Sequence, residues 1–220
     1  MLKAIRYLLT FLKWGLCIGV IVVIGLAMTP VQLNTDWRSQ YPTLPNGCEA
    51  VSAAICLNYF NEYITAETFA SQYLPKAAVG TALPKDAYIG DPFSSGYYCY
   101  QLPLVHGINT FLSENGNTLA AHSHALTTVT EVALRVHAGK PVICWITVDD
   151  RLPAKNAEVE WKIGSRSYKP YKNLHVVTVD GTDFWRLHLQ DSVNGDRWIP
   201  IWKFLPEYYA MGMRAVYFSD

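Results

Sequence analysis

The order of apolar and polar positions from residue 48 to residue 218 predicts helices first and strands second. Apolar residues recur at roughly helical spacing over 48–60, 65–73, 102–113 and 127–138, and again over 200–209. The later apolar runs are short and continuous, at 141–147, 174–179, 184–189 and 214–218. Helices followed by strands are typical of the α+β class. We therefore expect one domain in which N-terminal helices pack on an antiparallel sheet.

Several connections between these elements can be predicted from turn chemistry. The segment 180–183, Asp-Gly-Thr-Asp, lies between two apolar runs and predicts a hairpin turn. His188 alternates with Leu187 and Leu189, so we expect its side chain to face solvent. Residues 29–46 are polar and interrupted by prolines, which predicts a linker that leads into the domain.

A long segment without clear periodicity, residues 74–100, is rich in glycine, proline and aromatic residues. Irregular loops of this length in compact domains are usually functional or disordered, and the tyrosines argue against disorder. Two interpretations remain: a loop that faces the substrate, or an aromatic loop that covers the core.

The N-terminal segment has the features of a membrane or targeting sequence. Lys3, Arg6 and Lys13 precede an uninterrupted apolar stretch from Trp14 to Met28. Positive charges before such a stretch predict a cytoplasmic N-terminus and a body outside the cytoplasm. The length of this stretch is at the upper limit of a signal-peptide core, about 15 residues, and below the about 20 residues of a spanning helix. We predict that residues 1–35 form a membrane anchor with a short linker, with a cleaved signal and secretion as the alternative, and that residues 36–220 form the exported domain.

Composition narrows the classes of function. The chain has 18 basic residues (lysine and arginine) and 18 acidic residues (aspartate and glutamate), so its formal net charge is zero. A nucleic-acid-binding protein usually has an excess of positive charge, so nucleic acid is not an expected partner. No zinc pattern of paired cysteines occurs, and we expect no metal and no cofactor. Cys56 and Cys144 fall inside predicted elements and are interpreted as core, whereas a disulfide through Cys99 is left open.

Cys48 is the candidate nucleophile. The helix breakers 45–47, Pro-Asn-Gly, end directly before it, so the cysteine lies at a helix N-terminus. Free backbone N–H groups and the helix dipole favour a thiolate at that position. Because the thiolate is the reactive form, we expect a lowered pKa and a nucleophilic role for Cys48.

His175 and Asp191 are the candidate partners. His175 opens one predicted strand and Asp191 ends the next. If the two strands pair, the start of one lies beside the end of the other, and both side chains reach the same rim of the sheet. A base and an orienting carboxylate require this arrangement, with His175 taking the thiol proton and Asp191 holding the ring.

The ordered set of these motifs resembles one known family. The motifs are Asn-Gly-Cys-Glu-Ala at 46–50, Gly-Asp-Pro at 90–92, Gly-Lys-Pro-Val-Ile at 139–143, the His175 strand that ends in Asp-Gly, and Asp191. They are similar to papain-like cysteine peptidases of the bacteriocin-leader-processing type, family thirty-nine, in its stand-alone exported C39-like branch. The resemblance covers about residues 43–218. It implies a papain-like fold, Cys48 as nucleophile, His175 as base and Asp191 as orienting residue.

One position departs from the papain-like pattern. Such peptidases commonly carry a glutamine about six residues before the nucleophile, where its side chain completes the oxyanion hole, but this chain has Pro42 there. Gln40 lies near but out of register. The backbone N–H of Cys48 supplies one donor, and Asn46 is the candidate for the other.

The sequence therefore predicts an exported or membrane-anchored cysteine peptidase that cleaves a peptide amide bond through a thioester at Cys48. Two alternatives stay open. One is a cell-wall peptide hydrolase of related fold. The other is a catalytically weak domain that binds peptides, which the missing glutamine would favour.

Overall fold

The structure is a computed structural model that describes Tyr7, residues 11–15 and residues 29–220. A mixed helix and sheet domain is built around an antiparallel sheet with the strand order β10-β9-β8-β5-β11-β4. A further short strand, β1, pairs with the end of β8. The strands are β1 (Val31–Gln32), β4 (Ala120–His122), β5 (Val142–Thr147), β8 (Leu174–Thr182), β9 (Arg186–Asp191), β10 (Gly195–Pro200) and β11 (Ala215–Ser219).

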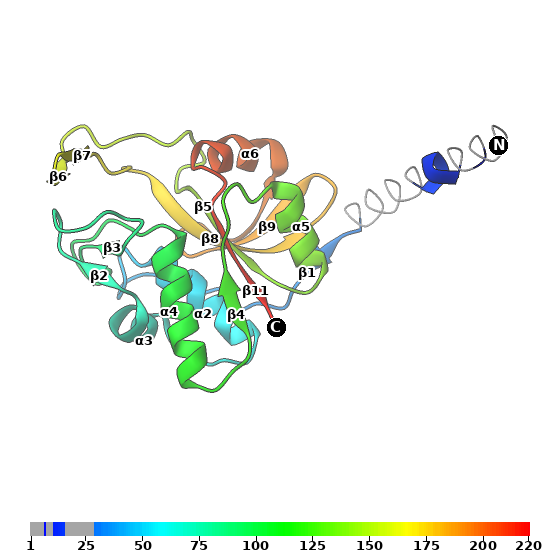
Figure 1. Ribbon diagram of the computed structural model, residues 1–220, viewed down its shortest axis with the longest axis horizontal. Coiled ribbons are helices and arrows are strands. Elements are labelled where there is room, and N and C mark those ends of the chain that lie inside the picture. The colour runs from blue at the N-terminus through cyan, green and yellow to red at the C-terminus, as the bar shows by residue number, and fades with distance from the viewer. Residues whose placement is uncertain (1–6, 8–10, 16–28) are drawn as a thin grey trace.

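Helices cover both faces of this sheet (Figure 1). The helical elements are α2 (Cys48–Tyr59), α3 (Ala66–Thr68), the π-helical turn η1 (Phe69–Tyr73), α4 (Gln101–Glu114), α5 (Val129–His137) and α6 (Ile201–Ala210). Two small pairs of strands lie outside the main sheet: β2 (Lys76–Ala77) with β3 (Tyr88–Ile89), and β6 (Trp161–Ile163) with β7 (Arg166–Tyr168).

The central position of β5 in the sheet explains why all its residues except Thr147 are apolar. Ile143 and Trp145 pack in the cluster formed with α2 and α4, whereas Val142, Cys144 and Ile146 pack in the cluster formed with α5 and α6. A strand that is buried on both faces needs apolar residues at every position rather than at alternate ones. All six residues of β5 are buried. The α+β class and the helices predicted on this sheet are confirmed.

The prediction that residues 29–46 form a linker is wrong. Val31 and Gln32 pair with Thr182 and Gly181 of β8, and the Trp37 indole N–H donates to the backbone oxygen of Asp191. A Cβ on Gly181 would approach the Val31 backbone oxygen at 3.0 Å, so the glycine permits this close approach. The segment is part of the domain, which therefore begins before residue 36.

The turn between β8 and β9 also differs from the prediction. Asp180 and Gly181 belong to β8, with a bulge between Val179 and Gly181, and the chain reverses at residues 183–185. Asp183 accepts hydrogen bonds from the backbone N–H groups of Trp185 and Arg186 and fixes this turn. The side-chain hydrogen bonds of one aspartate place the reversal three residues later than the Asp-Gly signal indicates.

The predicted exposure of His188 is wrong. Its side chain is buried between Asp180 and Asp196, with ring nitrogens 2.7 Å from a carboxylate oxygen of each. The Trp198 ring packs against it at 4.8 Å between centroids. Burial lowers the pKa of His188, but the hydrogen bond and charge of Asp180 and the charge of Asp196 outweigh that effect and raise it. His188 does point to the opposite face of the sheet from Leu187 and Leu189, as the alternation predicts, but residues of β10 and of the N-terminal segment cover that face.

The remaining predictions concern thiols and the N-terminal segment. Cys48, Cys56, Cys99 and Cys144 are all buried and free, so Cys99 forms no disulfide. In the described residues no helix combines enough length and apolar character to cross a membrane. Most of the stretch from Trp14 to Met28 lies outside the described residues, so the anchor stays a prediction.

Candidate active site

The entry to α2 fixes the position of Cys48. A Cβ on Gly47 would lie 2.6 Å from the Cβ of Leu44, so only glycine fits between the preceding turn and the helix. The Asn46 backbone N–H donates to the Pro92 oxygen, and the Tyr88 hydroxyl donates to the Asn46 oxygen. The Gly-Asp-Pro segment at 90–92 is thereby tied to the turn that precedes Cys48. Cys48 is 7% exposed.

The thiol of Cys48 has two polar neighbours. It donates a hydrogen bond to the Glu49 carboxylate at 3.2 Å, and the backbone of Val176 also bonds to it. Burial and the Glu49 charge raise the pKa of Cys48 well above its ordinary value, and the Val176 bond offsets only part of that rise. The expected lowering of the Cys48 pKa is therefore wrong for this arrangement, because desolvation and an adjacent carboxylate outweigh the helix N-terminus.

The side chain of Glu49 is a buried carboxyl group that lies between two cysteines, Cys48 and Cys99. One oxygen accepts the Cys48 thiol proton, and the other accepts the backbone N–H of Cys99 at 2.8 Å. Burial raises the pKa of Glu49 to about 7, although these hydrogen bonds lower it in part. The charge beside the thiol therefore changes near neutral pH. Glu49 also fastens the end of the loop 74–100 to the start of α2.

Replacing Glu49 by glutamine is expected to raise the reactivity of Cys48. The Glu49→Gln side chain still accepts from Cys99 N–H but carries no charge, so the pKa of Cys48 falls. Each unit of that fall raises the thiolate fraction about tenfold. We expect iodoacetamide to alkylate Cys48 about tenfold faster at neutral pH. Glu207→Gln is the matched control, since Glu207 is also buried, bonds Thr147 and has a pKa raised to about 7. Equal rates in wild type and Glu49→Gln would contradict this role.

The same substitution is expected to change the pH dependence of stability. The folded-state pKa of Glu49 lies above its ordinary value of 4.5. The protonated carboxyl group therefore contributes fully to the free energy of unfolding below pH 4.5, and this contribution is lost as the pH rises towards about 7. For a fully buried group this corresponds to about 3 kcal/mol at most. The free energy of unfolding of Glu49→Gln should accordingly fall less steeply over this range than that of the wild type.

The structure brings His175 and Asp191 together. His175 Nε2 lies 2.7 Å from Asp191 Oδ1, and both side chains are buried. The register of the antiparallel pair β8 and β9 places the beginning of one strand beside the end of the other. This geometry holds Nε2 as the donor to the carboxylate, which leaves the lone pair of Nδ1 available as a base.

Asp191 is held by many donors. Oδ1 also accepts the backbone N–H groups of Val193 and Asn194, and Oδ2 accepts the side chains of Asn194 and Arg197. Burial alone would raise the pKa of Asp191, but the His175 bond and charge and these backbone N–H groups bring it well below its ordinary value. Asp191 is therefore charged over the whole neutral range and fixed in orientation.

Cys48 and His175 lie on neighbouring elements. The thiol is bonded to the backbone of Val176, the residue that follows His175, and Ser52 of α2 donates to the Val176 oxygen. Among the contacts of the described residues, the thiol donates to Glu49 and not to the His175 ring. Catalytic hydrogen bonds are often long or misaligned without substrate, so the bond to Glu49 does not exclude a pairing of Cys48 with His175.

The candidate oxyanion residue Asn46 is occupied elsewhere. Its side-chain amide donates to the Ser94 oxygen at 2.7 Å, which ties the turn to the 91–95 loop. The structure instead brings Gln40 into the site. This buried side chain donates to the Pro45 oxygen and accepts from the Ser192 hydroxyl, each at 2.8 Å. It therefore bridges the turn before Cys48 and the residue after Asp191, and among the contacts of the described residues one of its two amide hydrogens is used.

No group of three or more histidine, cysteine, aspartate or glutamate side chains in the described residues could hold a metal ion. His122 and His124, which are close in sequence, have separate partners: Ser219 for His122, and Glu131 with Tyr217 for His124.

Comparison with known proteins supports the fold. The chain is 28% identical over 156 residues to the uncharacterized protein YvpB of Bacillus subtilis (strain 168), which covers 68% of this chain and 59% of that protein. A crystal structure from Bacillus anthracis, assigned to the C39-like peptidases, superimposes with a TM-score of 0.76 at 24% identity and covers 87% of this chain and 98% of that one. Xylellain, a cysteine protease from Xylella fastidiosa, is similar at 11% identity over 90% of this chain and 87% of its own, but its TM-score of 0.43 supports no functional argument.

The family is shown by the sequence match. The model of the Peptidase_C39 like family matches residues 32–216, which include Gln40, Cys48, His175 and Asp191. The match begins within β1, in agreement with a domain that starts before residue 36. The chain belongs to the Peptidase_C39 like family.

Proposed function

We propose that this protein is a cysteine peptidase in which Cys48 attacks a peptide carbonyl, His175 is the general base and Asp191 orients the histidine. The observation that carries the proposal is the buried pair of His175 Nε2 and Asp191 Oδ1 at 2.7 Å, beside the helix start that presents Cys48. The family assignment supports a peptidase in general.

The raised pKa of Cys48 indicates how the reaction begins. The resting thiol is neutral, so no preformed thiolate is available, and the proton must move when the substrate is bound. His175 Nδ1 takes the proton as sulfur attacks the carbonyl carbon, and Asp191 stabilises the imidazolium that forms. The Cys48 backbone N–H and the Gln40 amide are the proposed donors to the oxyanion.

The remaining steps use the same groups. The imidazolium protonates the leaving amine, and the C–N bond breaks to give a thioester at Cys48. His175 then removes a proton from water, which attacks the thioester carbonyl. Collapse of the second tetrahedral intermediate breaks the C–S bond, releases the carboxylic acid and returns the proton to sulfur.

We also propose an exported position at a membrane, supported by the charge-flanked apolar stretch 14–28. The substrate is a peptide or protein. The thiol bonded to Glu49 and the occupied Asn46 favour one alternative, a catalytically weak domain that binds peptides.

An activity-based thiol probe tests the proposed function. The full chain in detergent is treated with a peptidyl acyloxymethyl ketone between about pH 5 and pH 9. Labelling is expected in the wild type and absent in Cys48→Ala. Cys99→Ala is the matched control, because Cys99 is fully buried beside the same glutamate and should not react. Labelling that survives in Cys48→Ala, or no labelling of the wild type, would refute the peptidase and favour the binding domain.

A further inference from the structure

Three large aromatic side chains form an exposed patch at one end of the sheet. Phe184, Trp185 and Trp202, here called the aromatic patch, are 43%, 60% and 63% exposed. The rings of Phe184 and Trp185 lie 4.1 Å apart between centroids. Trp185 and Trp202 line one shallow hollow together with Pro200 and Arg186. Contiguous exposed aromatic groups on a folded domain mark a contact surface.

The aromatic patch is held rigidly rather than carried on a loose loop. Asp183 accepts the backbone N–H groups of Trp185 and Arg186, and its side chain pairs with that of Arg186. The Ile201 N–H donates to the Trp185 oxygen at 2.8 Å, which joins the start of α6 to the turn between β8 and β9. Indole rings kept exposed by a fixed backbone therefore present a constant surface to a partner.

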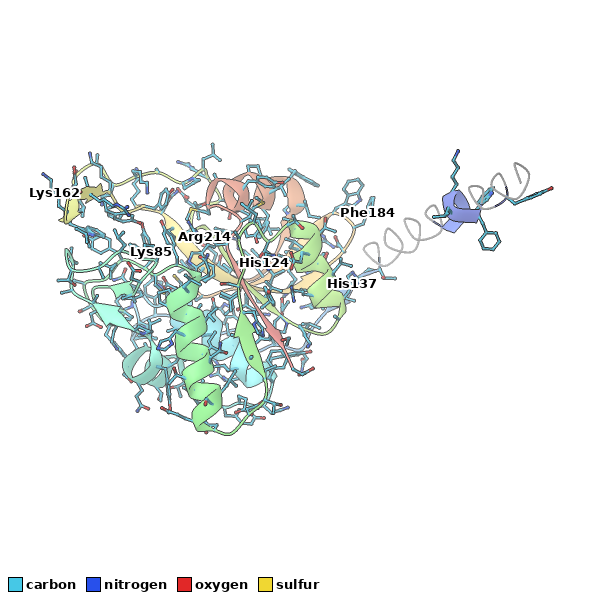
Figure 2. The ribbon with its side chains drawn as sticks, in the orientation of Figure 1. Lys85, His124, His137, Lys162, Phe184 and Arg214 are labelled. Carbon is cyan, nitrogen blue, oxygen red and sulfur yellow. The ribbon has the colours of Figure 1, made fainter. Side chains whose placement is uncertain are left out.

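The position of the aromatic patch identifies the partner. Val31 of β1 pairs with Thr182, two residues before Phe184, and Val31 is only the third residue after Met28, the end of the apolar stretch. Three extended residues span about 10 Å at most. Figure 2 shows Phe184 at the edge of the domain where β1 lies, far from Lys162 on the opposite edge. A bilayer that holds residues 14–28 would thus meet the aromatic patch first.

The chemistry of the aromatic patch suits the interfacial region of a bilayer. Tryptophan is enriched there because its ring is apolar and its N–H remains hydrated. Lys203 is exposed beside Trp202, and Arg186 lies over the Trp198 ring at 4.9 Å. Asp183, the acidic residue in the hollow, is already paired with Arg186.

We propose that Phe184, Trp185 and Trp202 insert into the headgroup region of the membrane and fix the orientation of the domain on it. This inference requires the proposed membrane location and not the proposed peptidase chemistry. Insertion of the aromatic patch would hold this end of the sheet against the lipid and leave the β6–β7 end of the domain directed away from the membrane (Figure 1).

Fluorescence quenching in lipid vesicles tests the proposal without any measurement of activity. The full chain is reconstituted in vesicles of phosphatidylcholine and phosphatidylglycerol, either plain or with bromine atoms near the headgroup end of the acyl chains. The double variant Trp185→Phe with Trp202→Phe keeps the patch apolar but removes its two indoles. The emission lost in this variant is therefore the emission of the patch.

Brominated lipid is expected to lower that difference emission at least about twofold. Trp161→Phe is the matched control: Trp161 lies in β6, so its difference emission should be the same in both kinds of vesicle. Equal difference emission from the patch in plain and brominated vesicles, or a chain that does not associate with the vesicles, would overturn the proposal. If the activity-based probe fails to label Cys48 but the patch emission is still quenched, the peptidase proposal fails and the membrane proposal stands.

Discussion

Replacing His175 by glutamine is expected to lower kcat/KM by at least about 10³-fold, because the site loses the base that takes the Cys48 proton. The raised pKa of Cys48 makes this loss large, since almost no thiolate forms without a base. The glutamine amide can still donate to Asp191, so the buried carboxylate keeps a partner and the fold is retained. The measurement is steady-state cleavage of a peptide substrate, with thermal unfolding recorded on the same samples.

His188→Gln is the matched control for this experiment. His188, like His175, is a buried β-strand histidine with a ring nitrogen 2.7 Å from an aspartate oxygen. Both variants should lose a similar amount of stability, because each leaves a weaker partner for a buried carboxylate. Only His175→Gln should lose catalysis. Equal losses of kcat/KM in the two variants, in proportion to their stabilities, would mean that His175 has only a structural role.

The parts of the molecule that local patterns determine were predictable from the sequence. The helix that starts at Cys48 follows from the breakers 45–47, and β5 follows from a run that is apolar at every position except the last, Thr147. His175 and Asp191 could be placed side by side because antiparallel neighbours bring the start of one strand to the end of the next. That inference does not depend on where the turn lies, so it survived the shift of the reversal to residues 183–185.

The failures share a cause, which is contact between segments far apart in sequence. The segment 29–46 contains few apolar residues, and its order comes from pairing with β8 and from the bond of Trp37 to Asp191. The exposure of His188 was misjudged because Asp196 and Trp198 of the neighbouring strand and Gln32 of β1, far away in the sequence, all contact its ring.

The pKa of Cys48 was misjudged for a similar reason. A helix N-terminus can be recognised in the sequence, but the extent of burial and the direction of the neighbouring Glu49 side chain cannot. The Glu49 carboxylate turns back towards the thiol because its other oxygen is engaged by Cys99, fifty residues further along the chain.

Gln40 was considered out of register because the spacing to Cys48 differs from that of papain-like enzymes. The turns at residues 41–43 and 45–46 shorten the path, and the side chain still reaches the Pro45 oxygen and Ser192. A glutamine upstream of the nucleophile, in a segment rich in turns, was the signal that could have identified it. Its amide nitrogen is the side-chain donor that we expect to bind the oxyanion.

Replacing Gln40 by methionine is therefore expected to lower kcat by about 10²–10³-fold, because one donor to the oxyanion is lost. Methionine keeps the length and much of the volume of the side chain. Alkylation of Cys48 by iodoacetamide passes through no tetrahedral oxyanion, so its rate should change by less than about twofold. Ser192→Ala, which removes a partner of Gln40 but not the donor itself, is the matched control and should have a smaller effect on kcat. If Gln40→Met instead slows cleavage and alkylation to the same extent, the side chain only supports the turn that presents Cys48, and the oxyanion is bound by other donors.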